Sequence, residues 1–439
     1  MKKILYFIIA VGLLGITSCE KWIDPKVNDN PDALTSVPLN LLLPNIEVGY
    51  AYITGDFDVV GNTGIWLNYF AGVDRQASAV NSYTQASDDV NNLWGSYYSG
   101  IMTDCKKIIE QSQEAGVESP HYAGVAKIIL AASLGNVTSL WGDVPYSEAF
   151  KGAENLHPAY DPQEQIYQTI QSLLDEAISD LSATENYYPL QNDLIYSGNL
   201  NLWIKLAHSL KARYAMHLSK KGENAAATAV LTALNNGLAS NADNANLFFS
   251  SATPTENNPM FQFIDQRSGY IEPDPDFAAM MAGDPRADVL ANDDITLNAY
   301  TQADAPVSIM TYVEVLFLKA EANFIKGNAI DAANAYNNAL EASLRQFGVF
   351  DQAWFDAHKL DQTTVTRQAI IEGKYKALVA TLEPFNDWRR TGFPVLTVNQ
   401  PNVNQNKIPV RFLYPTDERT YNRNCPSGVG LNDKPWVFQ

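Results

Sequence analysis

Five histidines and 49 acidic residues are the side chains of this chain best suited to catalysis or metal binding. Enzymes that depend on a metal or a nucleophile carry such residues at fixed spacings, for example two histidines one helical turn apart. The histidines form no such pair: they are His121, His157, His208, His217 and His358. We therefore expect no catalytic residues. The enzyme class that stays open is a glycoside hydrolase, because it needs only two carboxylates whose separation is spatial.

Neighbouring aspartates raise the question of a calcium site. They occur at Asp88–Asp89, Asp274–Asp276 and Asp293–Asp294. None of these pairs has the graded ligand spacing of an EF-hand loop. We interpret them as solvated loop charges and expect neither a metal nor a cofactor.

The stretch from Trp66 to Trp94 mixes aromatic rings with amides and a guanidinium group outside any clear helical pattern. Sugar rings stack on aromatic faces while their hydroxyl groups pair with amides and guanidinium groups, so this mixture suits a carbohydrate. The candidate ligand-binding residues are Trp66, Asn68, Tyr69, Arg75, Gln76 and Tyr83. A competing stretch, Phe261 to Tyr270, offers Phe263, Gln266, Arg267 and Tyr270. The alternative for each of these rings is packing in the core.

The N-terminus carries the residues for lipid attachment. Two lysines precede the apolar run Ile4–Leu14, which is the order of a secretory signal, and the run is too short to span a bilayer. Cys19 follows in Leu14-Gly-Ile-Thr-Ser-Cys, which resembles a bacterial lipobox. A lone cysteine at this place favours acylation. We predict a signal peptide over residues 1–18, lipidation of Cys19, and a tether over residues 19–44, rich in Pro, Asn and Asp.

Other features narrow the class of protein. The formal net charge of −19 argues against nucleic acid, whose phosphates need a basic surface. We see no second apolar stretch of spanning length and expect a soluble body. Cys105 and Cys425 lack metal-ligand spacing, and both a disulfide and free thiols stay open for them.

Helical periodicity dominates beyond the tether. One apolar stripe runs from Ile166 to Leu181 and another from Trp203 to Leu218. From Tyr312 to Leu344, two helices joined by Lys326-Gly-Asn carry small residues at Ala320, Ala332 and Ala339, which resembles a tetratricopeptide hairpin. Weaker hairpins span residues 121–181 and 201–238, and loop-rich insertions span residues 241–304 and 385–439. We predict a mostly α fold of degenerate helical hairpins, forming a single domain over residues 45–439.

Several motifs resemble the SusD/RagB family of outer-membrane nutrient-binding lipoproteins, in particular its SusD-like branch. They are the lipidated start with Asp29-Asn-Pro-Asp, Leu140-Trp-Gly-Asp-Val-Pro-Tyr146, the helix Leu202–His217, the helix beginning at Met310, Asp387-Trp-Arg-Arg-Thr-Gly392 and Ile408-Pro-Val-Arg-Phe-Leu-Tyr-Pro415. From the residues alone, the Gly142–Pro145 segment suits a helix-terminating turn, and Arg389 and Arg390 suit structural caps or ion pairs.

The resemblance implies a lipoprotein that is anchored to the cell outer membrane by its N-terminal lipid and faces the outside of the cell. It also implies a SusC-like TonB-dependent transporter as the partner. It implies glycan capture and transfer to that transporter, with a RagB-like peptide-binding role as the alternative within the family. It carries over no ligand-contact residue to this chain. Hydrolysis stays the alternative from a different class.

Overall fold

The computed structural model describes residues 37–439. The predicted signal peptide, Cys19 and most of the predicted tether lie outside these residues. Helix α2 (Leu39–Gly55) begins within the segment assigned to the tether. Leu39, Leu42, Leu43, Ile46 and Tyr50 form its buried stripe, so the compact unit runs from Leu39 to Gln439 and not from residue 45.

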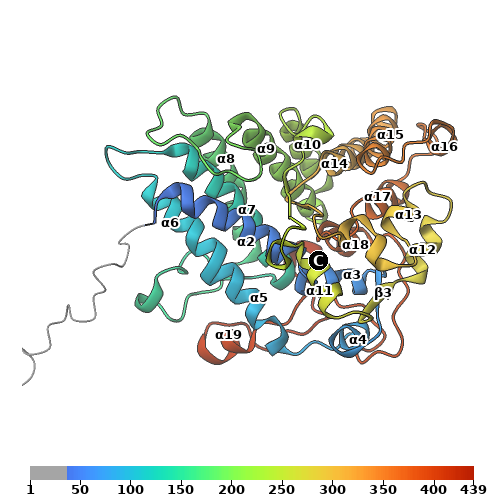
Figure 1. The fold of residues 1–439 in the computed structure, drawn as a ribbon, viewed down its shortest axis with the longest axis horizontal. Coiled ribbons are helices and arrows are strands. Elements are labelled where there is room, and N and C mark those ends of the chain that lie inside the picture. The colour runs from blue at the N-terminus through green and yellow to red at the C-terminus, as the bar shows by residue number, and fades with distance from the viewer. Residues whose placement is uncertain (1–36) are drawn as a thin grey trace, which may run out of the picture. The chain divides into compact units, whose positions relative to one another are not determined.

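Long helices form the frame, and they follow one another as hairpins. They are α7 (Pro120–Trp141), α8 (Gln163–Leu181), α9 (Leu200–His217), α10 (Glu223–Leu234), α14 (Tyr312–Ile325), α15 (Ala329–Gln346) and α17 (Arg367–Ala377). Each of α7 to α10 contacts the next, and α10 then contacts α14. Figure 1 shows α8, α9, α10, α14 and α15 as a row in sequence order. The predicted hairpins are confirmed. Their boundaries differ by a few residues, since the helix expected from Met310 begins at Tyr312 and α10 ends at Leu234 rather than at residue 238.

The α14–α15 hairpin shows why small residues matter for this frame. Gly327 has φ +77°, a conformation that turns the chain between the two helices without steric strain. Ala320, Ala332 and Ala339 are all buried, so the backbones approach closely. The Tyr336 ring meets Phe317 edge to face at 6.0 Å.

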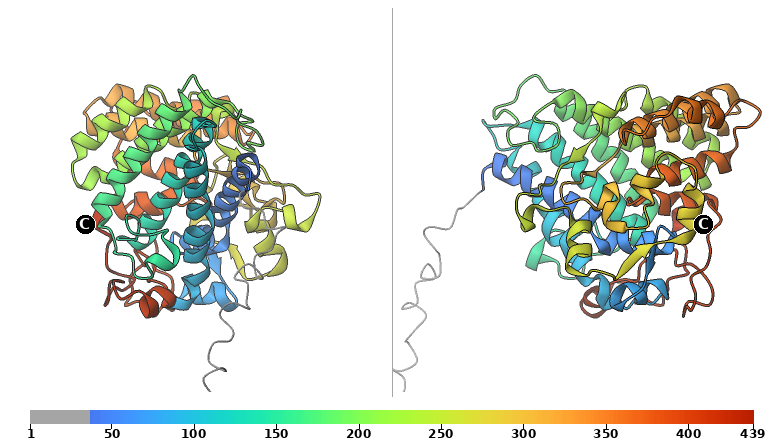
Figure 2. Two further views of the ribbon diagram at one scale, coloured as in Figure 1. Left: turned by 90° about the vertical axis from the view of Figure 1, so that its left-hand side faces the viewer. Right: turned by 45° about the vertical axis from the view of Figure 1, so that its right-hand side comes forward.

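Helix α7 lies at the centre of the frame, next to α2, and both are visible in the left view of Figure 2. Every residue from Tyr122 to Trp141 is buried. Its mean hydropathy of 1.4 and its length would suit a membrane span, contrary to the expectation from the sequence. Other helices cover it completely, so it is a core helix.

The insertions are more ordered than expected. They contain the short helices α11 (Pro259–Gln266), α12 (Pro275–Met281), α13 (Ala287–Leu290), α18 (Glu383–Thr391) and α19 (Thr416–Tyr421). Strand β2 (Asn246–Leu247) pairs antiparallel with β4 (Val307–Ser308). Strand β1 (Phe70–Gly72) pairs antiparallel with β3 (Ile271–Pro273), with Ala71 opposite Glu272.

The segment after α2 is also helical. It comprises η2 (Phe57–Gly61), α3 (Asn62–Trp66), α4 (Arg75–Asn81), η3 (Ser87–Val90), α5 (Asn91–Gly95), η4 (Ser96–Met102) and α6 (Thr103–Gln111). Between α15 and α17 lies α16 (Gln352–His358).

Buried ion pairs fasten α18 to the frame. Arg390 lies 2.5 Å from Glu321 of α14 and 2.8 Å from Asp387, and Asp387 lies 2.9 Å from Lys374 of α17. Arg389 donates to the carbonyl groups of Ser139 and Val410. Both arginines therefore have the structural roles predicted from the sequence. The predicted turn after α7 is also present, because Gly142 ends the helix with φ +86°.

Candidate ligand-binding site

A polar cleft of about 260 Å³ lies where α2, η2, α4 and α11 meet. We define this polar cleft by its lining residues, which are Tyr52, Asp56, Phe57, Asp58, Gln76, Pro259, Gln262, Phe263, Gln266 and Arg267. It lies in the part of the sequence where both candidate stretches are found.

The floor of the polar cleft is aromatic. The rings of Phe57 and Phe263 stack with centroids 3.9 Å apart and an interplanar angle of 3°. Both side chains are buried. This stack joins η2 to α11 and fixes the distance between the two walls.

The walls carry groups that pair with hydroxyls. Tyr52 donates to Gln262 Oε1 at 3.4 Å across the cleft, and it keeps 38% of its surface exposed. The Arg267 guanidinium group lies 5.2 Å from the Phe263 ring centroid, and its Nη1 donates to Gln266 Oε1 at 3.5 Å. Gln76 and Gln266 are exposed. Donors, acceptors and an apolar floor therefore occur within one cleft.

Two carboxylates of the polar cleft, Asp56 and Asp58, have raised pKa values. Asp56 caps η2 by accepting from the backbone N–H of Phe57 at 2.7 Å. Burial raises the pKa of Asp56. Burial, together with the carboxylates of Asp56 and Asp89, raises the pKa of Asp58 to about 6, although Arg267 opposes this. Asp58 therefore changes charge near pH 6.

The β1–β3 pairing brings the two candidate stretches together. Val73 N–H donates to the Tyr270 carbonyl at 2.8 Å, directly beyond the paired strands. The Arg75 guanidinium group lies 5.9 Å from the Tyr270 ring centroid, at a mostly exposed position. Arg75 and Tyr270 flank the cleft without lining it, whereas Gln76 and Arg267 line it. The stretches are thus two sides of one region.

The other predicted residues do not face this cleft. Trp66 is 1% exposed and packs against Phe385 and Phe412 at 5.8 and 5.3 Å. Tyr69 is equally buried, stacks on Tyr375 at 4.2 Å and donates to its carbonyl. The sequence predicted that these rings meet a ligand in a loop, and the structure differs. Residues 57–66 form helices, and their apolar side chains join the core.

Asn68 and Tyr83 are buried in a polar cluster beside that core. Asn68 Nδ2 donates to Asn399 Oδ1 at 2.9 Å, and Asn68 Oδ1 accepts from the N–H of Thr397 at 3.0 Å. The Tyr83 hydroxyl accepts from the N–H of Asn399 at 2.8 Å. Because the amide of Asn68 and the hydroxyl group of Tyr83 already form hydrogen bonds with the C-terminal insertion, they hold that insertion in place and do not face a ligand.

Four residues that line the polar cleft were not predicted from the sequence: Tyr52, Asp56, Asp58 and Gln262. Asp56 and Asp58 flank Phe57 directly after the apolar stripe of α2, and two acidic residues at a helix end were a signal. Tyr52 and Gln262 gave no comparable signal, since each is one polar or aromatic position on an amphipathic helix.

Within residues 37–439, no group of three His, Cys, Asp or Glu side chains is placed to hold a metal ion. Cys105 and Cys425 are both free thiols, the first of them buried.

The described residues thus form a frame of helical hairpins with a polar cleft where α2, η2, α4 and α11 meet. The comparisons with known proteins identify this architecture. The chain belongs to the SusD-like family described as "Starch-binding associating with outer membrane", whose model matches residues 31–300 and 276–415.

Solved structures share this fold at low sequence identity. A SusD/RagB family protein from Bacteroides thetaiotaomicron is 23% identical with a TM-score of 0.72, covering 92% of this chain and 99% of its own. A Bacteroidetes SusD-like protein is 19% identical with a TM-score of 0.78, covering 92% and 100%. A chitin-binding SusD homolog from Flavobacterium johnsoniae is 20% identical with a TM-score of 0.72, covering 90% and 98%. A comparison with curated proteins found no match.

Proposed function

We propose that this protein captures oligosaccharides in the polar cleft and passes them to a SusC-like TonB-dependent transporter at the outer membrane. The family description, with its starch-binding and outer-membrane terms, supports the general role. The transfer to a transporter, the lipid anchor on Cys19 and the outward orientation are further parts of this proposal.

The observation that carries the proposal is the composition of the polar cleft. Its aromatic floor is almost fully buried, so a bound sugar would meet mainly the phenol of Tyr52 and the edges of the stack. Its walls present three glutamines, two aspartates and one arginine, and these side chains match the alternating donors and acceptors of sugar hydroxyls. Two of the neighbouring structures are described as chitin-binding, which favours a glycan over a peptide.

The first test is binding by variants of the polar cleft. A glycan and peptide array with the full chain identifies the ligand, and calorimetry then measures its affinity. Arg267→Ala and Gln262→Ala should each weaken binding by about 1–2 kcal/mol, because each removes a hydrogen-bonding group from the cleft. Their melting temperatures should stay close to that of the wild type, since both side chains are partly exposed.

Arg345→Ala is the matched control. Arg345 is an exposed arginine on α15, where it pairs with Glu341 at 2.8 Å, outside the polar cleft. The Arg345→Ala variant should bind the ligand with the same affinity as the wild type. If Arg267→Ala and Gln262→Ala also bind like the wild type, the cleft is not the ligand site. Selective binding of peptides would replace the glycan proposal, and sustained release of reducing sugar from a polysaccharide would replace binding by hydrolysis.

A further inference from the structure

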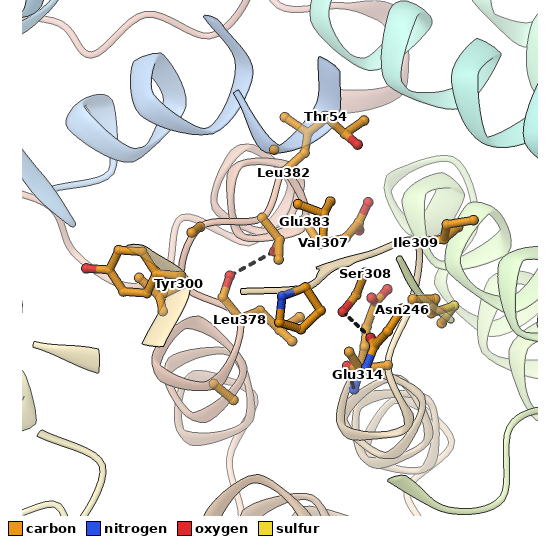
Figure 3. Close-up of a pocket in the computed structure, with 18 of the residues that line it drawn as sticks. Thr54, Asn246, Tyr300, Val307, Ser308, Ile309, Glu314, Leu378, Leu382 and Glu383 are labelled. Carbon is orange, nitrogen blue, oxygen red and sulfur yellow. Dashed lines mark hydrogen bonds between the residues drawn. The ribbon is translucent and has the colours of Figure 1, made fainter. Parts of the chain in front are cut away.

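A second hollow lies inside the helical frame. This inner cavity has a volume of about 420 Å³ and is bordered by α2, α9, α14, α18 and the β2–β4 pair. Figure 3 shows Tyr300 and Leu378 on one side of it, and Asn246 and Glu314 on the other. It shares no lining residue with the polar cleft. Phe248 lines it and is 68% exposed, so the inner cavity reaches the surface there.

Three buried polar side chains line the inner cavity with hydrogen-bonding capacity to spare. Arg213 is 5% exposed, and its Nε and Nη2 donate to Glu314 and to the Ile309 carbonyl. Its Nη1 has no acceptor among residues 37–439 and is not shut off from the cavity.

Asn136 and Tyr50 complete this group. Asn136 Nδ2 donates to the hydroxyl oxygens of Tyr50 and Tyr97, each at 3.3 Å. Within the described chain, Asn136 Oδ1 accepts no hydrogen bond and the Tyr50 hydroxyl finds no acceptor for its own proton. Both side chains are at least nine-tenths buried and line the cavity. Buried polar groups normally have hydrogen-bond partners. The donors Arg213 Nη1 and Tyr50 O–H and the acceptor Asn136 Oδ1 can therefore bind a ligand or water.

The charges around these groups select an uncharged ligand. Glu314 is held by Arg213 in two hydrogen bonds of 2.6 and 2.7 Å. Glu383 Oε2 lies 2.9 Å from His217 Nε2, and Glu383 Oε1 accepts from Asn386 at 3.0 Å. Burial opposes the ionisation of Glu383, but His217 and Arg213 outweigh it and lower its pKa. Since both carboxylates and Arg213 already have partners, a ligand with a net charge would be desolvated without a counter-charge of its own.

Apolar groups form a little more than half of the walls of the inner cavity. Met260, Leu290 and Ile309 are buried and line it, as do Leu378, Val379 and Leu382. A ligand must therefore combine an apolar face with one group that both accepts and donates hydrogen bonds. Uncharged amides and hydroxyl groups do so.

We propose that the inner cavity is a second ligand site, which takes one uncharged sugar-sized residue through an amide or hydroxyl group bound by Arg213, Tyr50 and Asn136. The apolar face of this residue lies against Leu290 and Leu382. The site is separate from the polar cleft, so the two can be tested independently.

The test uses the full chain and four probes of similar size in ligand-observed NMR and calorimetry. N-acetylglucosamine presents an amide, methyl glucoside presents hydroxyl groups, glucosamine adds an ammonium group and glucuronate adds a carboxylate. We expect the cavity to bind at least one of the two uncharged probes and to bind both charged probes more weakly. The comparison between the uncharged probes shows whether the amide or the hydroxyl group is recognised.

Two matched tyrosine variants locate the binding. Tyr50→Phe removes a hydroxyl group that lines the inner cavity and should weaken binding about three- to tenfold. Tyr97→Phe removes the other partner of Asn136 Nδ2 at the same 3.3 Å, but Tyr97 does not line the cavity, so its affinity should be unchanged. Arg267→Ala in the polar cleft should also leave this binding unchanged.

The proposal is overturned if no uncharged probe binds, if a charged probe binds best, or if Tyr50→Phe and Tyr97→Phe have equal affinities. If both tyrosine variants prove unstable, Ala299→Phe replaces them in the test. It introduces a ring at a residue that lines the inner cavity and should abolish binding. Retained binding in a folded Ala299→Phe protein would also overturn it. Oligosaccharide binding that depends on Arg267 but not on Tyr50 would leave the proposed function intact.

Discussion

Asp58 is the residue of the polar cleft whose charge responds most to its surroundings. Burial and two neighbouring carboxylates raise its pKa to about 6, while Arg267 stabilises the ionised form. The ionised carboxylate accepts hydrogen bonds from hydroxyl groups, and protonation removes much of this capacity. The polar cleft therefore has its full complement of acceptors only above about pH 6.

Glycan affinity should fall as the pH drops through the pKa of Asp58. At pH 5 about one-tenth of the Asp58 side chains are ionised, so the affinity should be up to about tenfold lower than at pH 7.5. Calorimetry at the two pH values measures this difference. Asp58→Asn should show no such dependence, and an unchanged slope in this variant would assign the effect to another group.

Trp66 illustrates how the same residue type serves the core. Trp66→Ala should lower the free energy of unfolding by about 3–5 kcal/mol, because it leaves a cavity against Phe385 and Phe412. Denaturant unfolding measures this loss. Tyr52→Ala, at a half-exposed position on α2, should lower the free energy of unfolding by about 1 kcal/mol or less. Equal losses in the two variants would contradict the assignment of Trp66 to the core.

At the scale of elements, the short helix α18 depends on charge rather than on apolar area. Its buried residues include Glu383, Asp387 and Arg390, whose partners lie on α9, α14 and α17. Arg389 is buried too and donates to Ser139 of α7 and to Val410. Such ion pairs contribute little net stability when intact, but the loss of one partner leaves an uncompensated charge in the core.

Arg390→Leu should therefore destabilise the protein by about 3–5 kcal/mol, since Glu321 loses its closest partner and Asp387 keeps only Lys374. Arg345→Leu breaks an exposed pair with Glu341 and should cost about 0.5 kcal/mol or less. Thermal and denaturant unfolding of the two variants supplies the comparison. A small loss for Arg390→Leu would show that the pair is not important for docking α18.

The elements also show how far the sequence alone could predict the structure. Long helices such as α8 and α14 repeat their apolar positions over several turns, so both their type and their limits were predictable. The polar cleft was not, because it depends on the pairing of β1 with β3, two strands of three residues each, across about 200 positions. Gln76 and Arg267 were found by composition, while Tyr52 and Gln262 are identified only by their meeting in space.

At the scale of the whole molecule, the proposed attachment to the membrane depends on Cys19. If Cys19 carries the lipid, Cys19→Ala should release the protein from the membrane fraction, because the chain is acidic, with a net charge of −19, and would not be held by an anionic membrane surface. Fractionation and palmitate labelling measure the effect. A Cys19→Ala protein that stays with the membrane, together with an unlabelled wild type, would contradict lipidation.

The complete burial of α7 bears on how the chain is made. If the N-terminal residues direct export, an unfolded chain passes a translocon while α7 still resembles a membrane span. Lys127 then also affects export, since a lysine costs about 2.5–3.5 kcal/mol at the centre of a membrane-spanning helix and less at the position of Lys127, which lies nearer the start of α7. In the folded protein the same ammonium group pairs with Glu176 and Asp180 at 2.9 and 2.8 Å. In an exported chain this charge would oppose arrest in the membrane, and in the folded protein it joins α7 to α8.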